Sequence, residues 1–418
     1  MAEIRPIKAL RYTSKAGPLS LNVCPPYDII SDEERAALIK GSPYNLVRLE
    51  KPEGENRYQI ASDLLEQWLA SGILERDKEE CIYVYGEDFE VKGERFSLKG
   101  IICLCKLYPF SEGVVLPHEN TLSHAKADRF ELMKTTLCNF SSIYGLYVDE
   151  EAQITSIVKS TAAKAPEQCF TDDEGVTHTL WRIESSSEVS QIVRAMADKQ
   201  IFIADGHHRY ETATKFCEYL TERGECTTGR DYVLMTLVDM DNDGLVIFPT
   251  HRLIHSMPVD KAALLAKLAD KFDVEEYDNV KLAEAVLSKY TDRKAYALYT
   301  GGEGFTLLVL KGMPEVKDDG GLSALDVSVL HDMILEDCLG IDKENMAAQR
   351  NLRYTRDINE AVESVRSGES SAAFILNPTK VGEIKSVSLS GGKMPQKSTY
   401  FYPKLKTGLV MNTIKDRN

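Results

Sequence analysis

Residues 204–210 combine side chains that bind phosphate with a glycine at the point where the chain must turn. Asp205-Gly206-His207-His208-Arg209 follows the apolar strand predicted at residues 200–204 and opens a strongly helical stretch at residues 209–223. Glycine allows a sharp turn there, and it leaves the first amides of the helix pointing outward as an anion site. His207, His208 and Arg209 stand where the helix dipole favours acidic residues. The sequence therefore predicts an anion-binding turn as the active centre.

Two other interpretations of this turn stay open. Asp205 could cap the helix, or it could serve as a general base or metal-bridging carboxylate toward a phosphoryl group. One histidine could be hydrogen-bonded within the core, with Arg209 paired to Glu211 or to a neighbouring carboxylate. We favour a functional role for this turn. Three potentially cationic residues in the first turn of a helix lower its stability, and such unfavourable placements are expected at functional sites.

A second cluster places acidic, basic and cationic groups within a dozen residues. His118 and Glu119 lie in a loop that opens a predicted helix, and Lys126 and Arg129 follow. Because Lys126 and Arg129 are three residues apart, they would share a helical face and could clamp a second phosphate or a carboxylate. The alternative is a solvated charged loop with local ion pairs.

A third cluster, residues 394–404, crowds lysines, hydroxyls and aromatic residues into a proline-bounded strand. Lys397, Ser398, Thr399 and Lys404 offer hydrogen-bond donors to phosphate oxygens. The alternative is an edge strand whose exposed lysines deter aggregation. Near the N-terminus, Tyr27 and Asp28 follow two prolines in a rigid loop and could line a pocket, although this motif alone indicates only a turn.

The amino-acid composition indicates which binding partners and which cellular compartment to expect. The 418 residues carry 65 acidic and 50 basic side chains, a formal charge of −15, which disfavours nucleic acid as a partner. The nine cysteines are odd in number and scattered, as in a reduced cytoplasmic protein, and Cys103 and Cys105 would point to opposite faces of a strand. No apolar run predicts export or a membrane span. Neither a Walker-type phosphate loop nor a dinucleotide-binding glycine fingerprint is present.

The pattern of elements predicts an α+β (mixed α/β) fold in four regions. Helices are expected at residues 32–40, 57–70, 188–198, 324–338 and 357–367, strands at 81–107 and 372–376, and an Asp-Gly hairpin around residues 232–248. The regions are an N-terminal α+β region (1–150), a central region with the phosphate-binding strand-turn-helix (151–255), an inserted α+β subdomain (256–320) and a C-terminal region that completes the site (321–418).

Four motifs together resemble a bacterial and archaeal family catalogued as a domain of unknown function. They are Pro-Pro-Tyr-Asp, Pro-His-Glu-Asn-Thr with Lys-x-Asp-Arg, Ala-Asp-Gly-His-His-Arg-Tyr-Glu-Thr-Ala, and Met-Pro-x-Lys-Ser-Thr with Pro-Lys. The turn Gly206-His207-His208-Arg209 also resembles the phosphate-binding turn of the ParB/sulfiredoxin-like superfamily, which includes kinases that act on free serine. The resemblance implies a ParB/sulfiredoxin-like core with additional α+β subdomains.

The function expected from these residues and this resemblance is phosphoryl transfer between a small donor, such as pyrophosphate, and the hydroxyl of free serine, with Mg²⁺. Asp205, His207 and Glu119 are the expected catalytic residues. Binding of phosphate and substrate is assigned to Gly206, His208, Arg209, Tyr210, His118, Lys126, Arg129, Tyr27, Asp28, Lys397, Ser398, Thr399 and Lys404. The alternatives are a phosphoserine phosphatase and a ParB-like nucleotide-binding regulatory protein. Metal ligands and oligomeric state stay open.

Overall fold

A computed structural model describes the chain except for residues 120, 122, 226–228, 315–318, 396 and 415–418. The chain forms two compact units. Unit 1 comprises Met1–Pro117, Thr121–Leu245 and Pro403–Asn418, and unit 2 comprises His118–Asn120 and Val246–Tyr402. The regions predicted at 1–150 and 151–255 fall mainly in unit 1, the region at 256–320 falls in unit 2, and the region at 321–418 is divided at Pro403. The predicted mixed α/β fold class is confirmed.

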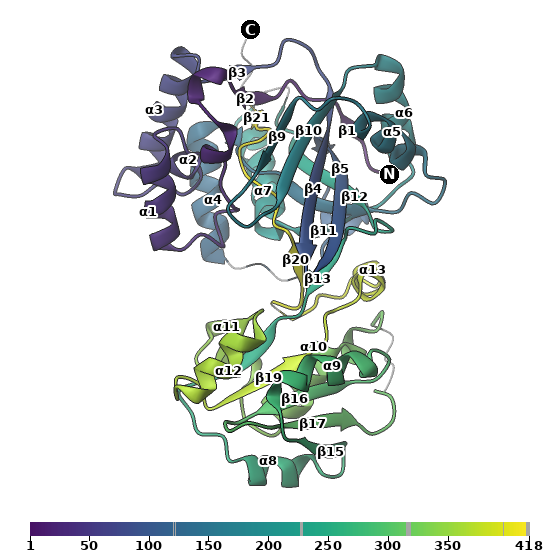
Figure 1. The fold of residues 1–418 in the computed structure, drawn as a ribbon. Coiled ribbons are helices and arrows are strands. Elements are labelled where there is room, and N and C mark those ends of the chain that lie inside the picture. The colour runs from purple at the N-terminus through teal and green to yellow at the C-terminus, as the bar shows by residue number, and fades with distance from the viewer. Residues whose placement is uncertain (120, 122, 226–228, 315–318, 396, 415–418) are drawn as a thin grey trace. The chain divides into compact units, whose positions relative to one another are not determined.

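Unit 1 is built on a nine-stranded mixed sheet (Figure 1). Its strand order is β6 (Val115–Leu116), β11 (Ile201–Asp205), β8 (Ile143–Tyr147), β12 (Tyr232–Asp239), β5 (Glu94–Lys106), β4 (Ile82–Val91), β10 (Thr177–Ile183) and β9 (Gln168–Thr171), and β1 (Ile4–Arg5) also pairs with β5. The pairs β6–β11 and β8–β12 are parallel, whereas the other pairs are antiparallel. Since β11 ends at Asp205, the sheet places the predicted turn at the end of a buried strand.

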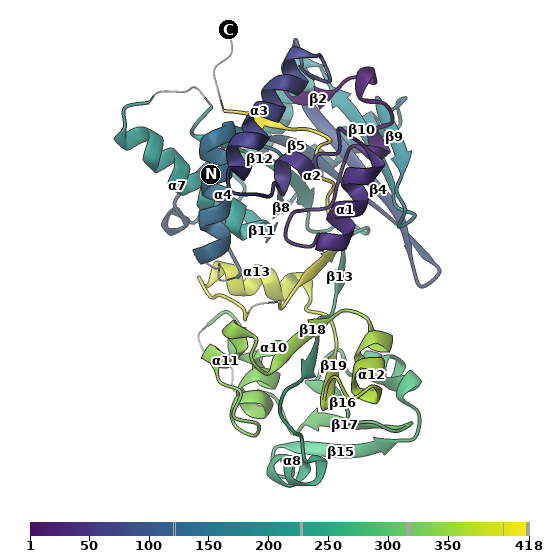
Figure 2. The ribbon, with the colours of Figure 1, turned by 90° about the vertical axis from the view of Figure 1, so that its left-hand side faces the viewer.

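The helices of unit 1 are α1 (Asp32–Gly41), α2 (Val47–Glu50), α3 (Arg57–Ala70), α4 (Ser123–Thr136), α5 (Gln153–Ala162), α6 (Ser186–Met196) and α7 (His207–Glu222). Helix α4 packs against both α3 and α7 (Figure 2). Tyr210, Phe216 and Leu220 bury one face of α7 in the core of the sheet, which fixes the direction of the helix. Helix α3 has the predicted boundaries, and α7 begins two residues before the predicted start.

The C-terminal segment of the chain is part of the core of unit 1. Met411 is fully buried among residues of α2 and α3, and its backbone pairs with that of Leu10. The backbones of Cys24 and Thr407 also pair. Two short ribbons, β2 (Leu10–Tyr12) with β3 (Leu74–Arg76) and β7 (Cys138–Asn139) with β21 (Asn412–Thr413), complete this region. The segment therefore holds Lys404 and Lys406 in fixed positions.

Unit 2 contains a six-stranded antiparallel sheet in the order β15 (Phe272–Tyr277), β17 (Phe305–Leu310), β16 (Ala295–Tyr299), β19 (Ala372–Leu376), β14 (His251–Ile254) and β18 (Leu352–Thr355). Strands β16 and β17 form an antiparallel hairpin that is closed by residues 301–304. The helices are α8 (Lys261–Leu268), α9 (Ala283–Leu287), α10 (Asp326–Val329), a π-helix (Leu330–Glu336), α11 (Lys343–Ala348), α12 (Ile358–Arg366) and α13 (Val381–Leu389). Short 3₁₀ turns connect several elements of both units.

The hairpin predicted around residues 232–248 is wrong. Strand β12 lies between β8 and β5, and β13 (Val246–Phe248) pairs instead with β20 (Tyr400–Tyr402) in unit 2. The Asp243-Gly244 turn carries the chain from one unit into the other. A Cβ atom at Gly244 would lie 2.4 Å from the backbone of Ser97, so glycine is required by a close approach.

In the region predicted as a strand at residues 394–404, the short strand β20 is the only strand among the described residues. Among the described residues, no helix is both long and apolar enough to cross a membrane. The described cysteines are all free thiols, and burial raises the pKa of Cys105 to about 12.

Candidate functional site

The predicted turn lies at the junction of β11 and α7 in unit 1. Gly206 is the N-cap of α7 with φ 92° and ψ 27°, a left-handed conformation that glycine adopts without strain. The N-cap residue is a glycine and has no side chain that could cap the helix, and Asp205 lies one residue before it. His207 is buried and His208 is half-buried. The predicted turn therefore lies at a helix N-terminus that opens with glycine, a position that favours anions.

Asp205 is held between two cationic side chains. Its Oδ1 atom lies 2.5 Å from Nζ of Lys404, and its Oδ2 atom lies 2.7 Å from Nη2 of Arg209. Burial disfavours the charged form of Asp205, but Lys404 and Arg209 outweigh burial and hold its pKa well below the usual range. One carboxylate thus faces two cations, which leaves an excess of positive charge beside the start of α7.

Arg209 is fixed in position by the protein. Nη1 donates to the carbonyl oxygen of Ser142 at 2.6 Å, and Nη2 donates to Asp205. A guanidinium has five N–H donors, and Arg209 commits two of them to the described residues. The remaining donors can grip two phosphate oxygens at once. Of the alternative pairings, the one with Glu211 is not formed, because Glu211 accepts from Lys126 and Thr121, whereas pairing with a neighbouring carboxylate is observed with Asp205.

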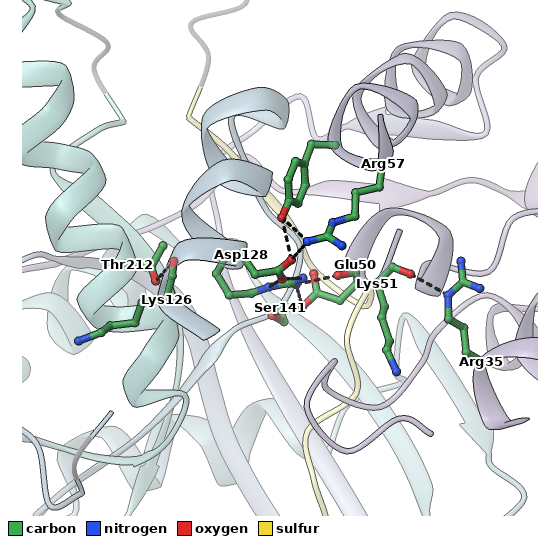
Figure 3. Close-up of polar contacts among 10 residues, drawn as sticks. Arg35, Glu50, Lys51, Arg57, Lys126, Asp128, Ser141 and Thr212 are labelled. Carbon is green, nitrogen blue, oxygen red and sulfur yellow. Dashed lines mark hydrogen bonds and ion pairs between the residues drawn. The ribbon is translucent and has the colours of Figure 1, made fainter. Parts of the chain in front are cut away.

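A polar network that includes Glu50, Asp128 and Ser141 lies beside α4 (Figure 3). Arg129 donates to the Asp128 carboxylate and, at 2.7 Å, to the backbone oxygen of Glu50, and its guanidinium lies 4.0 Å from the ring centre of Tyr27. Burial raises the pKa of Glu50, against the charges of Arg129 and Arg209 and a hydrogen bond from Ser141. Each guanidinium nitrogen of Arg129 thus donates one hydrogen bond to the protein, and its predicted role in phosphate binding stays a prediction.

This network is adjacent to the predicted turn. Glu50, Ser141, Arg129 and Arg209 line one cavity of about 40 Å³, roughly the space of one water molecule. The charge of Arg209 also acts on Tyr27, whose pKa is raised by burial. The structure therefore places Tyr27 and Arg129, which were predicted from two separate motifs, close to Arg209. Glu50, which was not predicted, lies beside them.

The predicted residues His118, Glu119, Ser398 and Thr399 form their own cluster in unit 2. The Nε2 atom of His118 lies 3.0 Å from Oγ1 of Thr399, which donates to Oε1 of Glu119 at 3.2 Å. Ser398 is buried and donates to the backbone oxygen of Pro395. Two motifs 280 residues apart in sequence thus meet within one unit. Their neighbour Asn120 lies outside the described residues.

Three other predicted residues have distinct positions. The Tyr210 hydroxyl is buried, accepts from the amide of Tyr108 and donates to its carbonyl, so it anchors α7. Asp28 and Lys397 are exposed, and Lys397 has a positive φ of 57°.

The structure shows a further buried network that sequence analysis missed. Tyr85, His178, Asp172 and Lys406 are linked in series: the Tyr85 hydroxyl lies 2.8 Å from Nδ1 of His178, whose Nε2 lies 2.9 Å from Asp172 Oδ2, and Lys406 Nζ lies 2.7 Å from the same oxygen. Because Lys406 is two residues from Lys404, this network holds the segment that delivers Lys404 to the turn.

Replacing Asp172 with asparagine is expected to destabilise unit 1 by about 3 kcal/mol at pH 7, since Lys406 would keep a mostly buried charge without its partner. Hydrogen bonds from His178 and Lys406 lower the pKa of Asp172 despite burial. A lowered folded-state pKa stabilises the fold above the unfolded value of about 3.9, and this contribution is lost as pH falls. The difference from wild type should therefore shrink below about pH 4.

Tryptophan fluorescence in urea measures this effect in unit 1 alone, because Trp68 and Trp181 both belong to it. Equal unfolding midpoints for wild type and Asp172→Asn at pH 7 would contradict a structural role for the network.

Binding of Mg²⁺ by the described side chains stays a prediction, because one or two carboxylates together with substrate phosphates are enough to hold it. Among the described side chains, no group of three or more His, Cys, Asp or Glu side chains is placed to hold a metal ion. Both carboxylate oxygens of Asp205 already contact cations. We therefore assign no step of the chemistry to a protein-bound metal.

Comparison with known proteins gives a family match over most of the chain. Residues 4–328 match the model of the family described as a protein of unknown function (DUF1015). No curated protein matches the sequence. Similar solved structures include a free serine kinase in complex with AMP, with 15% identity over 71% of this chain and 89% of that chain and a TM-score of 0.37.

Two further solved structures have comparable similarity. A conserved hypothetical protein from Pyrococcus furiosus is 15% identical over 71% of this chain and 93% of that chain, with a TM-score of 0.35. SbnI with a C-terminal truncation, from Staphylococcus aureus, is 11% identical over 75% of this chain and 90% of that chain, with a TM-score of 0.38. The family resemblance predicted from the four motifs is confirmed: this chain belongs to the DUF1015 family.

Proposed function

We propose that the turn at Gly206 binds a phosphoryl group and that the protein is a phosphotransferase. One observation carries this proposal: two cations, Arg209 and Lys404, share the carboxylate of Asp205 directly before the start of α7. A helix start and an excess of fixed positive charge both favour a phosphate anion. Phosphoryl transfer needs mainly positioning and neutralisation of charge, which these residues supply.

In the proposed reaction the hydroxyl oxygen of free serine attacks a phosphorus atom of a small donor such as pyrophosphate. A new P–O bond forms, the bridging P–O bond of the donor breaks, and inorganic phosphate leaves with the hydroxyl proton on the oxygen that bridged the two phosphorus atoms. The choice of serine rests on the resemblance of the motifs. The amides after Gly206 and the side chains of Arg209 and Lys404 would hold the transferred group.

Asp205 is better suited to positioning than to proton transfer. Because its pKa is lowered by Lys404 and Arg209, it is a weak base. We therefore propose that Asp205 orients the two cations before phosphate binds. The predicted roles of Glu119, Lys397 and Ser398 toward a second phosphate or the hydroxyl proton stay predictions, and the proposal does not depend on them.

Replacing Lys404 with methionine is expected to weaken pyrophosphate binding about tenfold, because it removes one charged contact worth about 1.5 kcal/mol. Arg209 still pairs with Asp205 in this variant, so the fold should be kept. Isothermal titration with pyrophosphate measures the change. Lys215→Met, an exposed lysine about two turns further along α7, is the matched control and should bind as wild type does. Equal affinity of both variants for pyrophosphate would show that Lys404 is not part of the binding site.

The activity itself is tested by incubating the full chain with L-serine, Mg²⁺ and, in separate reactions, pyrophosphate, ATP or ADP. Formation of phosphoserine from at least one donor is expected. Release of phosphate from phosphoserine in the absence of an acceptor would indicate a phosphatase instead. Binding of nucleotide without turnover of any substrate would indicate a regulatory protein, and it would contradict the proposed phosphotransferase.

A further inference from the structure

Unit 2 contains a buried arginine, Arg252, that contacts no carboxylate among the described residues, although the charge of Glu119 acts on it. Arg252 on β14 is fully buried, and among the described residues it takes part in no ion pair. Its Nη1 atom donates to the carbonyl oxygen of Thr250, its Nε atom donates to Nε2 of His331 at 3.3 Å, and its Nη2 atom has no hydrogen-bond partner among the described residues. Burial lowers the pKa of Arg252 to about 10, so it stays charged at neutral pH.

An uncompensated buried charge is costly for a fold, and an apolar side chain would be more stable at such a position. Arg252 lies on a sheet face opposite Tyr354 of β18, with 5.3 Å between its guanidinium carbon and the ring centre. Local rules of stability are broken mainly at functional sites. The region next to Arg252 is therefore a candidate functional site.

The two side chains that contact Arg252 form part of the wall of a cavity. This cavity has a volume of about 440 Å³, within the range of small-molecule sites, and His331 and Tyr354 line it together with Ser328. His331 lies on the π-helix Leu330–Glu336, and such irregular turns are frequent at functional sites. Arg252 thus forms a second layer beneath the polar floor of the cavity.

His331 and Tyr354, which line the cavity next to Arg252, are both neutral hydrogen-bond donors. Burial, together with the charge of Arg252, holds the pKa of His331 well below its usual range, so its ring is neutral. Because Arg252 donates to Nε2, the ring hydrogen lies on Nδ1. Burial also raises the pKa of Tyr354, so its hydroxyl stays protonated.

The rest of the lining selects the size and charge of a ligand. Leu322, Met346 and Met394 supply apolar surface, and the exposed Lys343 and Lys393 oppose the acidic Asp319 and Asp332. These four charges balance, and Arg252 is the cation that contacts His331 and Tyr354, whereas the carboxylate of Glu119 acts on it without contact. One charge beneath neutral donors suits one negative charge, and acidic groups at the wall disfavour a dianion.

We propose that this cavity in unit 2 binds a small organic monocarboxylate, with its carboxylate on the His331–Tyr354 floor above Arg252 and its carbon body against the apolar wall. This site is separate from the turn at Gly206, and it does not depend on the proposed phosphotransferase activity.

Benzoate is the probe for this site in isothermal titration of the full chain. Benzamide, which has the same shape without the charge, should bind at least about tenfold more weakly, and phenyl phosphate should also bind more weakly. Arg252→Met should lower the affinity for benzoate about tenfold or more. Arg353→Met, on the same strand as Tyr354 but exposed and paired with Glu369, is the matched control and should bind benzoate as wild type does.

Two additional measurements keep the proposal falsifiable if Arg252→Met fails to fold. Tyr354→Phe should weaken benzoate binding severalfold, and ¹⁵N-labelled histidine spectra should show His331 as the Nδ1–H tautomer and shift its signals on titration. Arg209→Lys should leave benzoate binding unchanged, which separates this site from the turn in unit 1. Equal affinity for benzoate and benzamide, or unchanged benzoate binding in Tyr354→Phe and Arg252→Met, would overturn the proposal.

Discussion

Replacing Arg209 with lysine is expected to lower the rate of phosphoserine formation by about 100-fold or more, while the fold is kept. Arg209 contacts the Ser142 carbonyl with one terminal nitrogen and Asp205 with the other, so its orientation depends on the planar guanidinium. Lysine keeps the charge as a single point donor and cannot make these two contacts while it grips two phosphate oxygens. Steady-state kinetics with the working donor measures the loss.

Arg223→Lys is the matched control, because this arginine lies at the opposite end of α7 and pairs with Glu225 on the surface. It should keep wild-type activity. An Arg209→Lys variant that melts as wild type does and turns over at the wild-type rate with every working donor would show that the chemistry lies elsewhere.

Replacing Gly206 with alanine is expected to lower activity about as strongly as the change at Arg209. The alanine Cβ would lie 2.9 Å from Nη2 and 3.0 Å from Cζ of Arg209, so the guanidinium would be displaced from Asp205. The left-handed φ of 92° adds a strain of roughly 1 kcal/mol for any residue with a side chain. Pyrophosphate affinity and turnover should therefore fall together, with only a modest fall in melting temperature.

Gly93→Ala separates backbone strain from displacement of Arg209. Gly93 has a φ of 83° in the β4–β5 hairpin, and a Cβ atom there would meet nothing within 4 Å. This control should show a similar loss of stability with unchanged activity. Equal activity of the Gly206→Ala and Gly93→Ala variants would contradict the assigned role of the turn.

Much of the secondary structure could be predicted because local signals determine it. The boundaries of α3 agree with the prediction, and α1 begins at the predicted residue because Ser31 and Glu34 form a capping box. The prediction around Asp243-Gly244 failed for a physical reason. An Asp-Gly turn indicates a reversal of the chain, but strand pairing depends on distant partners, and β13 pairs with β20 more than 150 residues later.

The candidate site was only partly predictable for the same reason. The turn from Asp205 to Arg209 is local, so its residues and its glycine could be read from the sequence. The partners that decide its chemistry are distant: Lys404 reaches Asp205 across 199 positions. Glu50 could not be recognised, because it is an ordinary acidic residue at the end of a short helix and only burial beside Arg129 makes it unusual.

A crystal structure of the full chain with pyrophosphate tests the central claim most directly, because it locates the phosphate independently of turnover. The account predicts a phosphoryl group at the start of α7, within hydrogen-bond distance of the amides after Gly206 and of the side chains of Arg209 and Lys404. Pyrophosphate bound elsewhere, with the Asp205 contacts to Arg209 and Lys404 unchanged and no anion at the turn, would contradict it.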